Sequence, residues 1–118
     1  MKPMIVIPTY NESHNIEPLI RDIFALHIPD REVIIVDDSS PDGTAAIVER
    51  LIAEFPLHII KRNRKLGLGS AYVKGFKKAL ALGADAIFEM DADFSHNPAD
   101  VPRLIAALES ADMAIGSR

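Results

Sequence analysis

Short apolar runs alternate with segments of helical spacing along the whole of this chain. The runs are three to five residues long, and they cover residues 4–7, 33–36, 57–60, 86–90 and 113–115. Runs this short and this apolar are typical of strands that are buried on both faces of a parallel sheet. The sequence therefore predicts five strands.

The segments between these runs carry apolar residues at the spacing of an amphipathic helix. In the first segment, Ile16, Leu19, Ile20, Ile23 and Phe24 fall at i, i+3, i+4, i+7 and i+8. The later stripes are Val48, Leu51, Ile52 and Phe55; Tyr72, Phe76 and Leu80; and Val101, Leu104, Ile105 and Leu108. The spacing predicts four helices, each with one apolar side.

Residues that favour helix ends flank these stripes. Asn11 or Ser13 is expected to cap the first helix, and Pro56 to end the second. Gly83 is expected to cap the carboxyl end of the third helix. Asn97 followed by Pro98 is typical of a helix start and begins the fourth.

Strict alternation of strands and helices predicts an α/β fold, a Rossmann-like and mostly parallel sheet with helices on both faces. Its crossovers are expected to be right-handed. Such sheets bind ligands outside the carboxyl ends of their strands, near a topological switch point. A polar cluster follows every predicted strand, at residues 8–12, 37–44, 61–69, 91–96 and 116–118. We therefore expect the functional site along that edge of the sheet.

Asp91 and Asp93 form a carboxylate pair where the fourth predicted strand ends. Residues i and i+2 of extended chain point the same way, so both carboxylates can face one point. Hard cations such as Mg2+ and Mn2+ take carboxylate oxygens together with substrate phosphates. The alternative is a solvated loop with two helix-friendly acids. His96, beside the pair, is the one histidine that the sequence places near this chemistry.

Four cations lie within residues 61–65, just before Gly67, Gly69 and the predicted third helix. Free amides and the helix dipole at a helix start favour anions such as phosphate. The alternative is a solvated basic loop. The two glycines fit neither the dinucleotide fingerprint nor the Walker A loop. The sequence therefore gives little support to a dinucleotide-dependent enzyme or a P-loop NTPase.

Polar residues after the first two strands offer contacts for a nucleoside. Asp37 and Asp38 follow the second strand, where an acid can bind a base or ribose, although they also fit a plain loop pair. Tyr10 can stack on a base or pack over the end of the sheet. Glu12 fits the first turn of a helix equally well. Residues 42–44, Asp-Gly-Thr, are better explained as a turn and helix cap.

The composition is that of a globular domain. The chain has 118 residues, of which 48% are hydrophobic and 25% charged. The absence of cysteine excludes disulfides and thiolate metal sites and fits a cytosolic setting. A net charge of −4 argues against a general nucleic-acid binder. No apolar run is long enough to span a bilayer, and the first residues are too few for a signal peptide.

Four ordered motifs give the chain a family resemblance. They read Pro-Thr-Tyr-Asn-Glu at 8–12, Val-Asp-Asp-Ser-Ser-Pro-Asp-Gly-Thr at 36–44, Gly-Leu-Gly-Ser-Ala-Tyr at 67–72 and Met-Asp-Ala-Asp-Phe-Ser-His at 90–96. With them the chain resembles the family 2 glycosyltransferases of the GT-A fold, in particular the dolichol- or polyprenol-phosphate mannose synthases. The resemblance covers the whole sequence.

The resemblance implies an inverting, metal-dependent transfer of mannose from GDP-mannose to a polyprenyl phosphate. Its implied substrate-binding residues are Pro8, Tyr10, Glu12, Asp38, Lys65, Gly67, Asp91 and Ala92. Asp91 and Asp93 would bind Mg2+ or Mn2+, which would neutralise the diphosphate and make GDP a better leaving group. Asp93 and Arg118 are the implied catalytic residues, with Arg118 stabilising charge near the reacting phosphates.

Two departures from the family pattern bear on these expectations. Ser95 stands where some relatives carry a metal-binding glutamine. Family members also continue well beyond Arg118, so residues 1–118 are expected to be one nucleotide-sugar-binding domain without the acceptor half. That half supplies membrane contact, at the cytoplasmic face, and a further strand. We therefore expect unpaired sheet edges, and either self-association of the chain or direct pairing of the predicted fifth strand with the fourth.

Three alternatives remain at this stage. The donor could be a UDP-sugar, because the choice of base depends on loop detail. The chain could also bind a nucleotide sugar without turnover. A receiver-like signalling domain would need an aspartate after the third strand, where this sequence has Lys61 and Arg62.

Overall fold

A computed structural model gives the fold of the chain, and it describes residues 2–26, 28–64 and 66–92. The elements are β1 (Pro3–Thr9), α1 (Ile16–Ala25), β2 (Glu32–Asp37), α2 (Thr44–Leu51), β3 (Leu57–Lys61), α3 (Leu68–Ala81) and β4 (Ala86–Glu89). The predicted fourth helix and fifth strand lie outside the described residues. The prediction of self-association stays a prediction.

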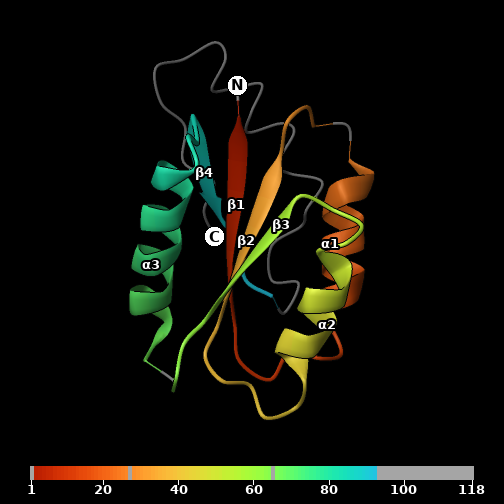
Figure 1. The fold of residues 1–118 in the computed structure, drawn as a ribbon, viewed down its shortest axis with the longest axis vertical. Coiled ribbons are helices and arrows are strands. Elements are labelled where there is room, and N and C mark those ends of the chain that lie inside the picture. Colours follow the sequence, from red (N-terminus) through yellow and green to blue (C-terminus); the bar gives the residue numbers. More distant parts are fainter. Residues whose placement is uncertain (1, 27, 65, 93–118) are drawn as a thin grey trace.

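The strands form one parallel sheet in the order β3-β2-β1-β4, with α1 and α2 on one face and α3 on the other (Figure 1). The predicted α/β class with helices on both faces is confirmed. The chain moves outward from β1 to β3 and then returns, through α3, to the other side of β1. The switch point of this sheet therefore lies between β1 and β4, where ligands bind in open α/β sheets.

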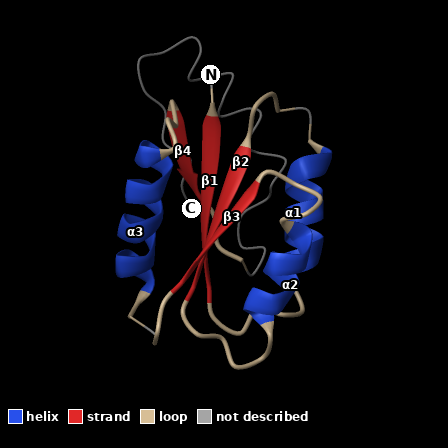
Figure 2. Ribbon diagram, in the orientation of Figure 1, coloured by secondary structure: helices blue, strands red, loops and turns tan. Residues whose placement is uncertain are grey.

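The central strand β1 explains why a two-sided core forms (Figure 2). Successive strand residues point to opposite faces, so Ile5 and Ile7 pack toward α1 and α2 while Met4 and Val6 pack toward α3. All four side chains are fully buried. Each such side chain contributes roughly 1.5–3 kcal/mol relative to an exposed one.

The predicted stripe of α1 is confirmed, but the predicted cap is wrong. Ile16, Leu19, Ile20 and Ile23 are all fully buried. The N-cap is Asn15, which makes no side-chain capping bond. Asn11 and Ser13 instead use their backbone N–H groups to bind the loop after β2, where Ser40 Oγ lies 2.9 Å and Asp42 Oδ2 lies 3.0 Å away. Asn11 and Ser13 therefore connect the loops after β1 and β2 and do not cap α1.

The second helix ends earlier than its apolar stripe. α2 stops at Leu51, and Ile52 is 39% exposed. Phe55 lies beyond the helix and stacks on Phe24 of α1, with ring centroids 4.7 Å apart. Phe55 therefore continued the helical spacing in the sequence although it lies in the turn after the helix. The predicted extent of this helix is wrong by several residues.

The third helix lies unusually close to the sheet. A Cβ at Gly75 would lie 2.3 Å from Cγ1 of Val6, so only glycine fits there. Gly83 has a φ of +84° and follows the C-cap, as predicted. Leu80 was expected to continue the apolar stripe but is 66% exposed, and the neighbouring Ala79 is buried instead. The inner side of α3 passes through Ala71, Gly75 and Ala79, and Leu80 points away from it.

Candidate functional site

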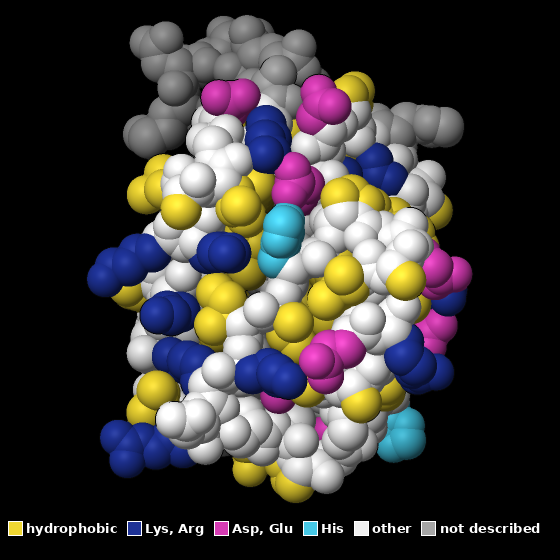
Figure 3. All heavy atoms as spheres, viewed as in Figure 1, with side chains coloured by type: hydrophobic (Ala, Val, Ile, Leu, Met, Phe, Trp, Pro, Cys, Tyr) yellow, Lys and Arg dark blue, Asp and Glu magenta, His cyan; other side chains and the backbone are white. Residues whose placement is uncertain are grey.

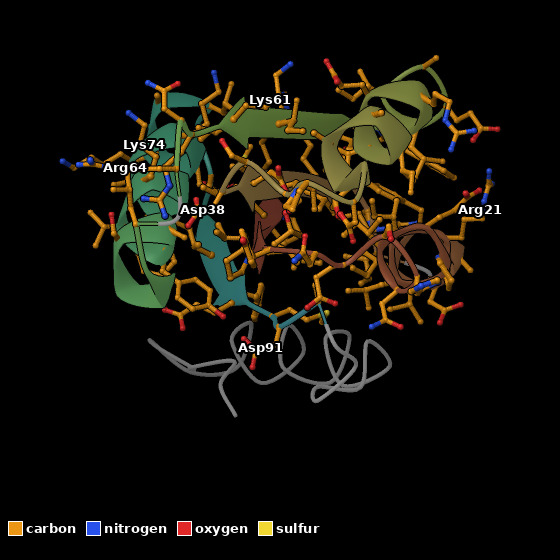
Figure 4. The ribbon with its side chains drawn as sticks, turned by 90° about the horizontal axis from the view of Figure 1, so that it is seen from below. Arg21, Asp38, Lys61, Arg64, Lys74 and Asp91 are labelled. Atoms are coloured by element: carbon orange, nitrogen blue, oxygen red, sulfur yellow. The ribbon has the colours of Figure 1, made fainter. Side chains whose placement is uncertain are left out.

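The loops after β1, β2, β3 and β4 meet at the carboxyl edge of the sheet, which Figure 4 shows from below. Asp38 lies near the centre of this edge and Asp91 at the β4 side. Lys61 and Arg64 point outward at its periphery. Of the labelled residues at this edge, the two acids therefore lie apart from each other, and Lys61 and Arg64 point away from both.

Asp37 joins the ends of β1 and β2 and is a structural residue. Its side chain is almost completely buried, and Oδ1 accepts hydrogen bonds from Thr9 Oγ1 and Ser40 Oγ, both at 2.6 Å. Ser40 N–H also donates to Oδ2 at 3.1 Å. Buried polar groups are costly unless they are paired, so these bonds fix the start of the β2–α2 loop.

Asp38 forms a buried ion pair that sequence reasoning missed. Arg62 Nε lies 2.6 Å from Oδ1 and Nη2 lies 2.8 Å from Oδ2, and both side chains are less than 10% exposed. Leu66 N–H donates to Oδ2 at 3.2 Å. A bidentate arginine is the strongest partner a carboxylate finds in a protein. Nucleoside contact by Asp38 stays a prediction, while its hold on the β3–α3 loop is observed.

Arg62 extends this network to the start of α3. Its Nη1 donates to Ser70 Oγ at 2.7 Å, and its Nη2 donates to the carbonyl of Gly67 at 3.2 Å. Gly67 is the N-cap of α3 and has a φ of +97°, which glycine adopts without strain. Arg62, predicted as part of a phosphate-binding zone, is thus committed to Asp38 and α3.

The remaining cations of that zone are arranged differently. Lys61 pairs with Glu49 at 3.2 Å on an exposed surface, and Arg64 is exposed. Lys65 lies outside the described residues. Neither Lys61 nor Arg64 points toward Asp91 (Figure 4), so the described cations do not converge on the predicted metal site.

The loop after β1 presents Tyr10 at the edge with 39% of its surface exposed. Pro8 and Glu12 are half-buried. Glu12 precedes α1 and is tied down: its N–H donates to Thr44 Oγ1 at 3.1 Å, and Asn15 Nδ2 donates to its Oε2 at 3.2 Å. An exposed ring on a fixed loop is suited to stacking on a base. The nucleoside roles of Pro8, Tyr10 and Glu12 stay predictions.

The turn predicted at residues 42–44 is confirmed. Asp42 Oδ1 accepts from Thr44 N–H at 3.2 Å and from Thr44 Oγ1 at 2.5 Å. Desolvation raises the pKa of Asp42, but the hydrogen bonds from Thr44 and Ser13 outweigh it and lower the pKa to about 2. A depressed carboxyl pKa stabilises the fold above its unfolded-state value, and this contribution is lost as the pH falls toward 2.

Asp91 lies directly beyond β4 and is held by α3. Tyr72 Oη donates to Asp91 Oδ1 at 2.8 Å, and Tyr72 is 6% exposed. Met90 N–H continues the strand pairing by donating to the carbonyl of Val6 at 3.1 Å. Sequence reasoning placed Tyr72 in the helical stripe and in the motif at 67–72 but did not link it to Asp91, because no local pattern links positions 19 residues apart. A phenol orients the carboxylate without neutralising its charge.

The predicted metal pair is described only in part. Asp93, the second carboxylate, lies outside the described residues, as do Ser95, His96 and Arg118. Within residues 2–26, 28–64 and 66–92, no three His, Asp or Glu side chains gather closely enough to hold a metal ion. Asp91 fits a hard cation as one oxygen ligand at the switch point. Ala92 is buried against the α1–α2 core, so any substrate contact it makes uses its backbone.

A parallel sheet covered by helices on both faces, with Asp91 beside its switch point, defines the class of open, doubly wound α/β folds. Within that class the chain belongs to Glycosyl transferase family 2, whose sequence pattern matches residues 4–118. The fold is of the GT-A type, as the recognised motifs predicted. The family resemblance is confirmed.

Individual relatives narrow the comparison. Undecaprenyl-phosphate mannosyltransferase of Micrococcus luteus is 44% identical over 119 residues, covering 100% of this chain and 49% of that protein. The chain therefore spans about half the length of this curated relative.

Two solved structures share the fold. Mannosyltransferase PcManGT from Pyrobaculum calidifontis, in complex with GDP-Man and Mn2+, superposes with a TM-score of 0.71 at 27% identity, covering 78% of this chain and 27% of that one. S. aureus TarS in complex with UDP-GlcNAc gives a TM-score of 0.77 at 25% identity, covering 93% of this chain and 32% of that one.

Proposed function

We propose that the protein transfers mannose from GDP-mannose to a polyprenyl phosphate, with a divalent metal ion and inversion at the sugar carbon. The placement of Asp91 carries this proposal: a carboxylate oriented by Tyr72 lies at the switch point, where a nucleotide diphosphate and its metal ion would bind. The similarity to a mannosyltransferase along the whole chain supports the choice of sugar and acceptor.

The donor would lie across the carboxyl edge of the sheet. Pro8, Tyr10 and Glu12 would hold the nucleoside from the loop after β1, with the predicted help of Asp38. Lys65, Gly67 and Ala92 are proposed as further donor contacts. Asp91 and Asp93 would hold Mg2+ or Mn2+, which when bound supplies charge neutralisation for the departing diphosphate. Arg118 is proposed to stabilise the same charge.

The acceptor supplies its own nucleophile, because a phosphate oxygen is already anionic. That oxygen would form a bond to the sugar carbon on the side opposite the diphosphate. The bond from that carbon to the diphosphate oxygen would break at the same time. GDP leaves with the electron pair, so no protein base is needed. The transfer is proposed to take place at the cytoplasmic face of a membrane. No described helix has the length and apolar character needed to cross a bilayer.

Calorimetric titration with GDP-mannose tests this proposal. We expect binding in the presence of Mn2+, at least about a tenfold loss when EDTA is added, and a similar loss in Asp91→Asn, because a carboxylate ligand strengthens metal binding. Asp22→Asn, which removes an exposed acid of α1, is the matched control and should bind as the unaltered chain does. Equal binding by Asp91→Asn and the unaltered chain, with and without metal, would refute the proposal.

A UDP-sugar donor is the second candidate, and the fold shared with UDP-GlcNAc-bound TarS favours it. The same titration with UDP-glucose and UDP-GlcNAc separates the two, because the preferred donor should bind more tightly by at least about tenfold. Turnover with added polyprenyl phosphate then separates a transferase from a module that only binds the nucleotide sugar.

A further inference from the structure

Charge is strongly segregated along the chain. Residues 61–84 contain seven of the 13 Lys and Arg residues and none of the 17 acidic ones. This segment carries +7 and the rest of the chain −11, which together give the net charge of −4. The segment runs from the end of β3 through the whole of α3, so one side of an acidic protein is basic.

The structure gathers five of these cations on one face, here called the basic face. It is formed by Lys61, Arg64, Lys74, Lys77 and Lys78 together with the apolar residues Leu66, Val73 and Leu80, all of which are exposed. Figure 3 shows the dark blue side chains gathered over α3 on the left of the molecule. Arg62 is excluded, because it is buried against Asp38.

A hollow of about 680 Å³ runs between β3 and α3 within this face. Its walls include Ile60, Arg64, Leu66, Val73, Lys74 and Lys77. The walls of the hollow thus combine apolar and cationic side chains.

The apolar residues of this face are unusual for a surface. Leu66 is 44%, Val73 54% and Leu80 66% exposed, and they are three of the five large hydrophobic side chains exposed among the described residues. Val73, Lys77 and Leu80 fall at i, i+4 and i+7, so they share one side of α3. The outer side of α3 therefore interleaves apolar side chains with lysines.

We propose that the basic face docks on the surface of an anionic phospholipid bilayer. The lysine ammonium groups would lie at the lipid phosphates, while Leu66, Val73 and Leu80 would reach the boundary of the acyl chains. Lysine stems can lie along apolar surface with the charge in the headgroup layer. The purpose of this docking rests on the proposed function. Docking would bring the carboxyl edge of the sheet near an acceptor that is carried by the lipid.

The residue types favour a bilayer over a protein partner. Protein interfaces are enriched in aromatic residues, Met and Arg and are depleted in Lys at their centres. The α3 part of the basic face has three lysines, no arginine and no exposed aromatic residue. Its apolar side chains are single and separated, which gives little contact area to a rigid partner but allows each to insert into lipid.

Co-sedimentation with vesicles tests the docking. We expect the chain to bind vesicles of phosphatidylcholine mixed with phosphatidylglycerol, not vesicles of phosphatidylcholine alone, and to dissociate as salt rises above about 0.1 M. The double variant Lys74→Glu/Lys77→Glu should lose at least about tenfold in affinity for the anionic vesicles. Val73→Ser/Leu80→Ser should lose several-fold at unchanged charge.

Matched controls locate the surface. Arg21→Glu/Arg50→Glu makes the same change of net charge on α1 and α2, and Ile52→Ser removes an exposed apolar residue elsewhere. Both should bind vesicles as the unaltered chain does, and thermal melting should show that all variants fold. Loss of binding in the Arg21/Arg50 variant equal to that in Lys74/Lys77 would overturn the assignment to this face.

Two further outcomes would overturn the proposal. One is the absence of binding to anionic vesicles. The other is binding to acidic polypeptides as tight as to vesicles with no effect of Val73→Ser/Leu80→Ser, which would indicate an acidic protein partner instead. The GDP-mannose titration keeps this test separate from the proposed function. Vesicle binding without donor binding would refute only the transferase assignment, and donor binding without vesicle binding would refute only the docking.

Discussion

The inner and outer sides of α3 are built from different kinds of residue. The inner side places Ala71, Gly75 and Ala79 at i, i+4 and i+8 against the sheet, all buried. The outer side carries Lys74, Lys77 and Lys78 with exposed Val73 and Leu80 between and beside them. The close approach to β1 requires the inner residues. Nothing in the packing requires the outer ones, so their residue types can vary without loss of the fold and are available for the proposed docking.

Replacing Arg62, which connects Asp38 to the start of α3, should have the largest effect on stability. Arg62→Met leaves the Asp38 carboxylate buried and unpaired and removes the contacts to Ser70 and Gly67. We expect a loss of about 3–5 kcal/mol in the free energy of unfolding, measured in urea. Arg64→Met changes an exposed cation of the same loop and should stay within about 0.5 kcal/mol. A loss for Arg62→Met as small as that would show that the pair adds nothing to the anchoring of α3.

Gly75→Ala should cause the next largest loss of stability. The new methyl would meet Val6, and overpacking costs about 1–3 kcal/mol, partly offset by the better helix propensity of alanine. Gly69→Ala, with no atom within 4 Å of its Cβ, should instead stabilise by up to about 1 kcal/mol. Urea unfolding of both variants, and of Gly75→Ala combined with Val6→Ala, measures the clash. Equal stabilisation by both alanines would contradict the close approach.

Tyr72→Phe should cost about 1 kcal/mol of stability, since it removes one hydrogen bond. Tyr72 is proposed to position Asp91, so Tyr72→Phe should also raise the Mn2+ concentration that GDP-mannose binding requires. Ser70→Ala removes a comparable bond, to Arg62, without touching Asp91. A metal requirement that shifts equally in both variants would mean that Tyr72 acts only through the stability of the helix.

The outer side should show the smallest effects on stability. Lys74→Gln and Lys77→Gln remove exposed charges that have no acidic neighbour on α3, so unfolding in urea should change by less than about 0.5 kcal/mol each. Vesicle binding should weaken in the same variants. A large stability loss here would show that the fold itself depends on the outer side.

The sequence allowed the four described strands and the α1 stripe to be predicted, because burial imposes a local period on side chains. It failed where a distant contact overrode a local preference. Asn11 and Ser13 are good caps by composition, yet their backbone groups bind Ser40 and Asp42. Leu80 fits a helical stripe, but the packing of Gly75 against Val6 turns Ala79 toward the sheet and leaves Leu80 exposed.

The candidate site was predicted by position and only partly by partner. Parallel topology placed Asp38 and Asp91 at one edge, and the structure confirms that both follow strands there. Their partners lie 24 and 19 residues away, at Arg62 and Tyr72, and no periodic pattern encodes those distances. Arg62 lies in a cationic run that predicted either a phosphate-binding zone or a solvated loop, whereas the fold pairs it with Asp38.

The strand order has a consequence for the chain during synthesis. β1 pairs with β2 on one side and with β4 on the other, but β4 follows β3 only after 24 intervening residues, 62–85. At ribosomal speeds these residues take about one to five seconds to appear. During that time β1 would have an open edge where β4 later pairs. Met4 and Val6 of β1 would also stay exposed until α3 packs on them. Until β4 pairs with β1, that open edge can pair with another chain, so the order of synthesis makes this edge the one most open to aggregation.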